Sequence, residues 1–284
     1  MNGLAADWLD LARTCFAAGR PCALVTITGI RGSAPREAGA RMLVTAAETA
    51  GTIGGGQLEL QAIAQARASL ASPMPEPQPL HFALGPELGQ CCGGTVDLAI
   101  EVLRDGDAAV LARWADEHVR ALPTRHLYLF GAGHVGTAVA RIVATLPYRL
   151  HWIDGRPGMA AAAAAIGLPL TVAREPGLEV DSAAADALYA VMTHSHALDL
   201  EICERVLRRG DFAFLGLIGS ATKRARFVKR LGGRGISEPL LQRLVCPIGV
   251  GGIRSKLPAA IAVGLAAQLL QVSEMNAARR LKIA

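Results

Sequence analysis

The sequence contains few aromatic residues, little net charge and no long apolar run. Phe, Trp and Tyr make up 4% of the 284 residues, which leaves few side chains to stack on nucleic-acid bases, so we expect no nucleic-acid partner. The formal net charge of +5 permits an anionic ligand or an acidic partner but requires neither. No uninterrupted apolar run reaches the ~20 residues of a membrane-spanning helix. The nearest, residues 259–272, includes Gln268, and we predict a buried core helix there and no membrane association.

The N-terminal stretch also lacks the features of a secretory signal. Residues 1–16 contain acidic side chains and a helical rhythm of apolar ones, in place of a basic start and an apolar core. We therefore expect a cytoplasmic protein whose six cysteines are reduced. Hydrophobic residues make up 51% of the chain and charged residues 19%, which predicts a well-buried core. The length suits one large domain or two of ordinary size.

The pattern of expected elements changes near the middle of the chain. Residues 1–105 are predicted to form a mixed α/β domain, in which short β-branched and apolar stretches indicate strands and longer amphipathic ones indicate helices. Residues 106–124 are expected to be a connector. The elements expected before it are helices over 4–19 and 57–70, and strands over 22–30, 41–45, 80–84 and 95–103.

Residues 125–284 alternate between short apolar strands and helices. This alternation predicts a Rossmann-like, doubly wound parallel sheet, so the fold class of the whole chain is α/β. The first β-α-β unit has about the ~30 residues that such a unit needs. The expected strands are 126–130, 149–154, 187–193 and 212–219, and the expected helices between them include 137–146 and 197–210.

A glycine motif lies between the first strand and the first helix of this second domain. Its residues are Gly131, Gly133 and Gly136, with His134 inside the motif and Asp154 at the end of the next strand. In this context the motif is typical of nucleotide-binding folds. The glycines allow a tight turn, the approach of a phosphate and close helix packing, and the acidic residue can accept a bond from a ribose hydroxyl. The alternative is that the glycines serve packing alone.

A second glycine-rich stretch, residues 51–56, precedes the helix expected over 57–70. Gly54, Gly55 and Gly56 would leave backbone N–H groups free to hold an anion, with Gln57 in the first turn of the helix. A plain tight turn before a capped helix explains the same residues equally well.

Two histidines follow the strand expected over 187–193. His194 and His196, with Asp199 after them, would lie at the carboxyl edge of the parallel sheet, where ligands commonly bind. They could contact a phosphate, move a proton or bind a metal. Alternatively, they are solvated and belong to an ordinary capped helix start.

Basic residues gather at the start of the helix that follows the strand over 212–219. Lys223, Arg224 and Arg226 could meet an anion. An ordinary solvated basic face is the interpretation we favour.

Two adjacent cysteines, Cys91 and Cys92, lie in the glycine-rich stretch 89–94. Adjacent cysteines lack the spacing of a zinc knuckle or of a dithiol redox motif. The nearby glycines leave backbone N–H groups free, an environment that favours the thiolate, which is both a nucleophile and a soft-metal ligand. A turn with two unreactive thiols is the alternative.

These segments, taken in order, resemble the XdhC/CoxI family of xanthine dehydrogenase accessory proteins. The stretches that carry the resemblance are 32–44, 51–59, 89–94, 127–136, 152–156, 192–200, 216–227 and 246–270. The resemblance implies a cytoplasmic chaperone, not itself an enzyme, with an N-terminal XdhC/CoxI domain and a C-terminal Rossmann-like domain. Such a protein binds the molybdenum cofactor, protects it, assists its sulfuration with a cysteine desulfurase and delivers it to apo-xanthine dehydrogenase. The resemblance also suggests a homodimer.

Under this resemblance the cysteines and glycines acquire roles in holding the molybdenum cofactor, or molybdopterin. We hypothesise that Cys91 and Cys92 approach the molybdenum or handle sulfur, and that glycine-rich loops hold the phosphate. The expected cofactor-binding residues are Cys91, Cys92, Gly54, Gly55, Gly56, Gln57, Gly131, Gly133, His134, Gly136, Asp154 and His194.

Two other functions remain open at this point. The chain could be an NAD-dependent oxidoreductase, because Asp154 favours NAD over NADP and His194 or His196 could relay a proton. It could also be an interaction module whose Rossmann-like domain holds no ligand.

Overall fold

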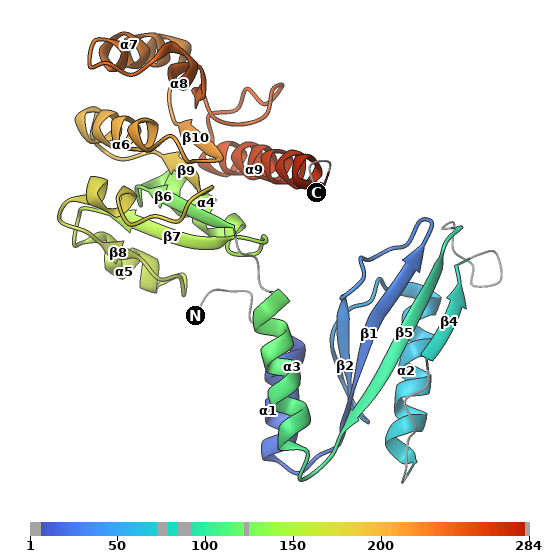
Figure 1. Ribbon diagram of the computed structural model, residues 1–284. Helices are drawn as coiled ribbons and strands as arrows, with labels where there is room; N and C mark the ends of the chain where they lie inside the picture. Colours follow the sequence, from blue (N-terminus) through green and yellow to red (C-terminus); the bar gives the residue numbers. More distant parts are fainter. Residues whose placement is uncertain (1–6, 73–78, 85–92, 122–124, 282–284) are drawn as a thin grey trace. The chain divides into compact units, whose positions relative to one another are not determined.

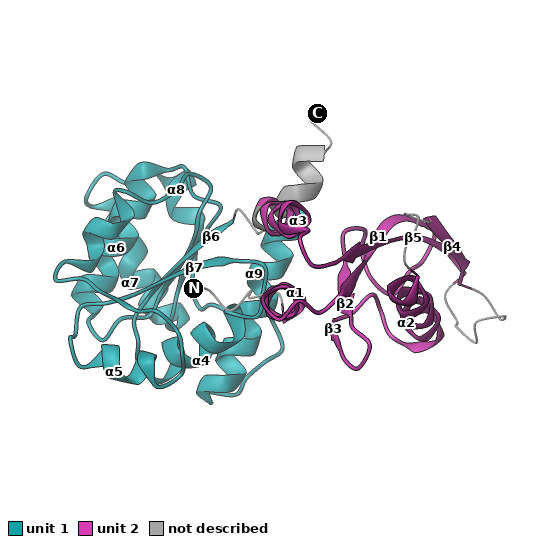
Figure 2. Ribbon diagram, turned by 90° about the horizontal axis from the view of Figure 1, so that it is seen from below, with its two compact units in different colours: residues 1–4, 122–284 teal, residues 5–121 magenta. Residues whose placement is uncertain are grey.

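The chain folds into two compact units. The computed structural model describes residues 7–72, 79–84, 93–121 and 125–281, so Cys91 and Cys92 lie outside the described residues. Residues 5–121, magenta in Figure 2, form one unit, which is called the first unit after its place in the sequence. The other contains residues 122–284, teal in Figure 2, and is called the second unit.

The unit of residues 5–121 is built on an antiparallel five-stranded sheet with the strand order β3-β2-β1-β5-β4 (Figure 1). The long strands β1 and β5 pair along almost their whole length at its centre. The elements are α1 (Asp7–Ala17), β1 (Cys22–Arg31), β2 (Arg41–Val44), β3 (Thr49–Gly51), α2 (Gly56–Ala71), β4 (Pro79–Ala83), β5 (Thr95–Leu103) and α3 (Ala108–Ala121).

Apolar residues on both faces of this sheet are buried, because successive side chains of a strand point to opposite sides. Ala23 and Val25 of β1 pack in the core that α2 covers. Cys22 and Leu24 pack in a second core with residues of α1 and α3. Helices on both faces explain why β1 has an almost continuous apolar sequence.

Helix α3 occupies most of the stretch expected to be a connector. Its Trp114 is fully buried in the core shared with α1, and the Trp114 Nε1–H donates to a carboxylate oxygen of Glu101 at 2.8 Å. Helix α3 is therefore part of the first unit.

The second unit is built on a parallel six-stranded sheet with the order β11-β10-β9-β6-β7-β8. The doubly wound parallel sheet expected from the sequence is confirmed. Its elements are β6 (His126–Phe130), α4 (His134–Val143), β7 (Arg149–Asp154), α5 (Met159–Ala164), β8 (Thr171–Val172), η2 (Pro176–Val180), β9 (Leu188–Val191), α6 (His196–Arg209), β10 (Phe214–Leu217), α7 (Ala221–Gly232), α8 (Glu238–Gln242), β11 (Leu244–Val245) and α9 (Pro258–Leu281).

Helices cover both faces of this parallel sheet. Residues of α4, α5 and α9 share a core with one face, and residues of α6, α7 and α8 share a core with the other. All four residues of β9 are buried, as expected for a central parallel strand. The chain runs outward from β6 to β8 and then returns to place β9 on the other side of β6. The direction of winding therefore reverses between β6 and β9.

Helix α9 contains the apolar segment that was expected to be a core helix. Ala262, Leu265 and Leu269 are buried in the core with α4. Within the described residues, Pro258–Met275 is the one helical segment long and apolar enough to cross a membrane, and 28% of it is buried. Core helices of soluble proteins meet the same criterion, so this segment is weak evidence for a membrane span.

Candidate functional site

The first candidate site lies at the carboxyl edge of the parallel sheet, between β6 and β9. The Met192 N–H, just after β9, donates to the Phe130 carbonyl at the end of β6 at 2.9 Å. A Cβ placed on Gly131 would lie 2.3 Å from the Met192 carbonyl oxygen. The glycine motif and the loop with the histidines thus meet where the winding reverses, which is where doubly wound sheets bind ligands.

The three glycines of the motif have different surroundings. Gly131 has a φ of 112°, and a Cβ on Gly136 would lie 2.0 Å from the Gly131 carbonyl oxygen, so backbone packing requires glycine at both positions. Among the described residues, no atom would lie within 4 Å of a Cβ on Gly133. Gly133 also caps α4 without a side-chain hydrogen bond. The first N–H groups of the helix, starting with that of His134, therefore suit an anion.

Asp154, expected to accept a ribose hydroxyl, is only 3% exposed. Its carboxylate accepts hydrogen bonds from the Ala132 N–H at 2.7 Å and from the N–H, Nε and Nη2 of Arg156, each at 2.9 Å. Burial opposes ionisation of Asp154, but the bonds from Arg156 and Ala132 outweigh it and lower the pKa. Asp154 thus holds the glycine loop, and a ribose would have to displace Arg156 to reach it.

A second buried carboxylate, that of Asp199, anchors the loop after β9. Asp199 is 0% exposed and accepts from the Thr193 N–H at 3.0 Å and the Thr193 hydroxyl at 2.7 Å. Lys223 Nζ donates to Asp199 at 2.8 Å and to the Ile218 carbonyl at 2.9 Å. Lys223 is therefore an internal structural cation rather than part of a solvated face.

The other two basic residues at this helix start also differ from each other. The Arg224 Nε donates to the Leu244 carbonyl at 3.3 Å, whereas Arg226 is exposed. Only Arg226 matches the expected solvated basic face.

The histidines near this edge are free to meet a ligand. His134, His194 and His196 are all exposed. Within the part of the chain that the structure describes, no group of three or more His, Cys, Asp or Glu side chains could hold a metal ion. The arrangement suits contacts to an anionic ligand better than a protein-held metal.

The second candidate site is the glycine-rich turn before α2, and a side chain of the chain itself fills it. One carboxylate oxygen of Glu59 accepts from the Thr52 hydroxyl at 2.5 Å and from the N–H groups of Ile53 at 3.1 Å and Gly55 at 3.0 Å. Gly54, Gly55 and Gly56 all have positive φ values, 124°, 77° and 63°, which suits glycine. A phosphate would have to displace Glu59.

Three sequence motifs converge at the end of β1. A Cβ on Gly32 would lie 3.1 Å from the Cα of Gly94. A Cβ on Gly94 would lie 2.3 Å from the Ser33 carbonyl oxygen, and one on Gly54 would lie 2.5 Å from Pro35 Cγ. The stretches 32–44, 51–59 and the last two residues of 89–94 therefore come together.

Sequence reasoning did not identify Glu59 as the residue that fills the turn, nor Asp199 and Lys223 as a buried pair. Glu59 lies in the first turn of its helix, where a carboxylate can reach back to free N–H groups. That position was a usable signal. The Asp199–Lys223 pair joins residues 24 positions apart, and no local pattern indicates it.

Two family models match the chain. The model described as the XdhC Rossmann domain matches residues 127–269, which is half of the chain. The model described as the XdhC and CoxI family matches residues 15–81.

One curated relative and one solved structure illustrate the similarity. The uncharacterized protein YqeB of Escherichia coli K12 is 28% identical over 258 residues, which cover 89% of this chain and 43% of the relative. The chain thus spans less than half the length of that relative. A Bacillus halodurans protein, whose crystal structure is described as that of a xanthine dehydrogenase, aligns with a TM-score of 0.75 and 19% identity. The alignment covers 97% of this chain and 96% of that one, and it shows a shared fold.

Proposed function

The chain belongs to the XdhC and CoxI family, and we propose that it is an accessory protein of a xanthine dehydrogenase. In this proposal it binds the molybdenum cofactor as cargo, assists its sulfuration together with a cysteine desulfurase and delivers it to the apo-enzyme. It performs no redox reaction of its own, and it works in the cytoplasm as a homodimer.

The convergence of three motifs at the end of β1 is the observation that carries this proposal. Gly94 packs against Gly32 and Ser33, and Gly54 packs against Pro35. Cys91 and Cys92 precede Gly93 and Gly94 in the sequence. Thiolates are suitable ligands for a thiophilic metal, and the two cysteines belong to a segment whose described end is packed against the other motifs.

The Rossmann-like loop suits a phosphate better than the turn before α2 does. No described residue fills the space beside Gly133, and the part of the chain that the structure describes offers the first N–H groups of α4 no side-chain acceptor. In the turn before α2, by contrast, Glu59 already accepts the hydrogen bonds that a phosphate would need. His134 and His194, exposed at the same edge as Gly133, are available to contact the anion.

An NAD-dependent reaction receives less support from the same loop. NAD recognition in such folds uses a carboxylate that accepts from the ribose hydroxyls. Here that carboxylate belongs to Asp154, which is committed to Arg156 and Ala132.

Co-purification from cells that make the cofactor tests the proposal. Cys91→Ala and Cys92→Ala would be prepared separately and compared with the unmodified protein for bound molybdenum, for fluorescence of the oxidised pterin and for activation of apo-xanthine dehydrogenase. We expect one of the two variants to lose most of the activation, because the side chains of adjacent residues often point apart.

Cys203→Ala is the matched control, because Cys203 belongs to α6 and is fully buried in the core of the second unit, so this variant should leave all three measurements unchanged. If Cys91→Ala and Cys92→Ala both retain bound cofactor and full activation, the proposed role of the two thiols is wrong. If the unmodified protein carries no molybdenum or pterin but binds NAD, the oxidoreductase is the better function.

A further inference from the structure

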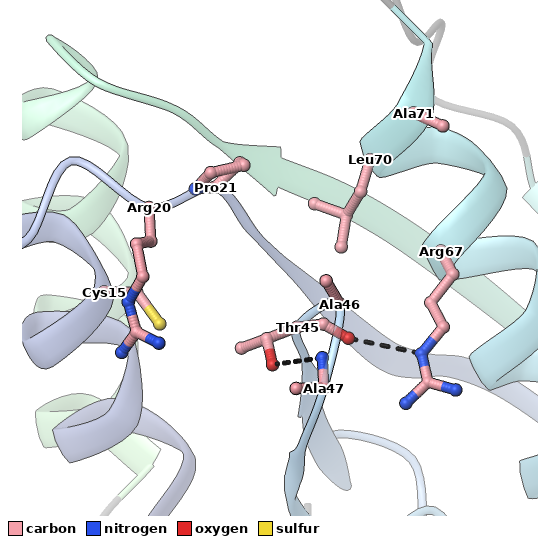
Figure 3. Close-up of a pocket in the computed structure, with 9 residues that line it drawn as sticks. All are labelled: Cys15, Arg20, Pro21, Thr45, Ala46, Ala47, Arg67, Leu70 and Ala71. Atoms are coloured by element: carbon pink, nitrogen blue, oxygen red, sulfur yellow. Dashed lines mark hydrogen bonds between the residues drawn. The ribbon is translucent and has the colours of Figure 1, made fainter.

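The first unit contains a cavity whose described lining includes no residue of the glycine-rich stretches. Its volume is about 520 Å³, within the ~300–1,000 Å³ typical of small-molecule sites. It is bounded by the end of α1, the residues before β1, the turn after β2 and the last turns of α2 (Figure 3).

This cavity is remote from the point at the end of β1 where the three motifs converge. Arg20 and Pro21 line it just before β1 begins, whereas Gly32 follows the last residue of the same strand. Strand β1 has ten residues, and at ~3.3 Å per residue its two ends lie about 30 Å apart. The cavity is therefore a separate site.

Two arginines give the cavity a positive charge. Arg20 and Arg67 line it from opposite sides (Figure 3), and none of the lining residues that the structure describes is acidic. The Arg67 Nε donates to the Thr45 carbonyl at 3.2 Å, which orients the guanidinium and leaves its terminal nitrogens available. Neither arginine forms an ion pair with a described residue.

The remaining wall is apolar or already hydrogen-bonded. Leu70 and Ala46 point into the space between the two arginines (Figure 3). The Thr45 hydroxyl is committed to the turn that it closes, since it accepts from the N–H groups of Ala47 and Glu48. Apart from the two arginines, the described lining residues therefore offer a ligand no free hydrogen-bonding side chain of oxygen or nitrogen.

The thiol in the wall behaves as part of the apolar surface. Cys15 is fully buried and lies against Cys22.

We propose that this cavity binds a small organic anion with an apolar body, such as an aromatic or aliphatic carboxylate or sulfonate. Arginine pairs readily with planar or tetrahedral oxyanions, and the apolar wall between the two guanidinium groups holds the body of the ligand. A cation is repelled, and a bare inorganic ion leaves the apolar wall uncovered. The inference does not depend on the proposed role in cofactor delivery.

A fluorescence titration with 8-anilinonaphthalene-1-sulfonate tests this inference on the full chain. The probe combines a sulfonate with an apolar body and becomes bright in an apolar site. We expect saturable binding to the unmodified protein and at least about tenfold weaker binding of N-phenyl-1-naphthylamine, which lacks the sulfonate, because one charged hydrogen bond is lost.

Three variants locate the binding. Arg67→Ala and Arg20→Ala should each weaken the sulfonate about tenfold. Ala46→Phe, at an exposed position, should abolish binding by filling the space while both arginines remain. Arg226→Ala, an exposed arginine of the other unit, is the matched control and should change nothing.

Melting temperatures of all four variants verify that each is folded. Equal affinity for the charged and uncharged probes, undiminished binding to Ala46→Phe, or the same loss in Arg226→Ala as in Arg67→Ala would each overturn the proposal.

Discussion

The two glycine-rich loops of this protein look alike in sequence but differ in what their backbone N–H groups hold. Both precede a helix, and both were expected to bind an anion. In the turn before α2, the Glu59 carboxylate accepts from two backbone N–H groups and one hydroxyl. In the loop before α4, no residue that the structure describes occupies the space beside Gly133, and the first helical turn contains no acidic residue.

This difference shows that glycines before a helix provide backbone N–H groups that could hold an anion. They do not prevent a side chain of the protein from accepting those hydrogen bonds first. A carboxylate in the first helical turn can reach back and serve as the anion itself. The neighbouring acidic residue, rather than the number of glycines, determines whether an external phosphate can bind without competition.

The largest expected effect is a difference in stability loss between substitution of Gly136, which packs against backbone, and substitution of Gly133, which does not. Gly136→Ala should lower the free energy of unfolding by about 3 kcal/mol or more, because its Cβ meets the Gly131 carbonyl oxygen, a backbone atom that cannot move aside. Calorimetric unfolding would measure the loss. Gly133→Ala is the matched control. Its φ of −74° suits alanine, so it should cost less than ~1 kcal/mol. Equal losses would show that the two positions do not differ as described.

Removing the Glu59 carboxylate should make the turn before α2 resemble the loop before α4, because its backbone N–H groups would then be free to bind an anion. Glu59→Ala leaves the N–H groups of Ile53 and Gly55 without their acceptor, and we expect a loss of about 2 kcal/mol in unfolding free energy. Added phosphate should then raise the melting temperature of the variant more than that of the unmodified protein. Glu48→Ala, at an exposed position, is the control. Identical phosphate responses of Glu59→Ala and the unmodified protein would contradict the comparison.

Freeing the Asp154 carboxylate from Arg156 should increase the affinity of the loop before α4 for NAD. Arg156→Ala removes the guanidinium that holds the carboxylate, so we expect NAD affinity to rise about tenfold, the equivalent of one charged hydrogen bond to the ribose. Isothermal titration calorimetry would measure it, with Arg226→Ala as the control. Tight binding of NAD to the unmodified protein would show that Arg156 does not block the site.

The smallest effect concerns acid sensitivity of the second unit. His126 Nδ1 and His151 Nε2 lie 2.8 Å apart. Burial, with a further contribution from Arg149, lowers the pKa of both below the usual 6.5. The unfolded chain therefore takes up protons first as the pH falls below 6.5, and stability present above that pH decreases toward the folded pKa values.

Melting temperatures between about pH 7.5 and 5.5 should reveal this loss, which we expect to be about 1 kcal/mol or less because His126 is partly exposed. His151→Phe keeps a ring stacked on Tyr128, whose centroid lies 4.4 Å from that of His151, and should flatten the pH dependence. His194→Gln, at an exposed position, should leave it unchanged. A variant His151→Phe as acid-sensitive as the unmodified protein would exclude the pair as the cause.

Much of the second unit could be predicted from local pattern. The strands over 126–130 and 149–154 have the bounds expected, and α6 is shifted by one residue. Parallel strands buried on both faces are short and continuously apolar, which makes them conspicuous in sequence. The roles of Gly131 and Gly136 followed from the same motif.

The remaining features depend on contacts between residues far apart in the chain. Trp114 places α3 in the first unit through its packing with α1. Lys223 donates to the buried carboxylate of Asp199 and so does not belong to the solvated basic face. The cavity between Arg20 and Arg67 exists because three separate segments end beside one another. No periodic pattern of apolar and polar residues in the sequence indicates any of these contacts.

By itself, the sequence determined the two-part α/β organisation, the glycine positions that the Rossmann-like loop requires and the family to which the chain belongs, because each rests on residues close together or in a fixed order. Only the tertiary structure decided which polar groups stay available to a ligand. In the sequence, Asp154 and Glu59 both look like carboxylates that a ligand could reach. In the folded chain, both already accept hydrogen bonds from other residues of the protein. A hydrogen-bonding group is available only when the folded chain supplies no partner for it.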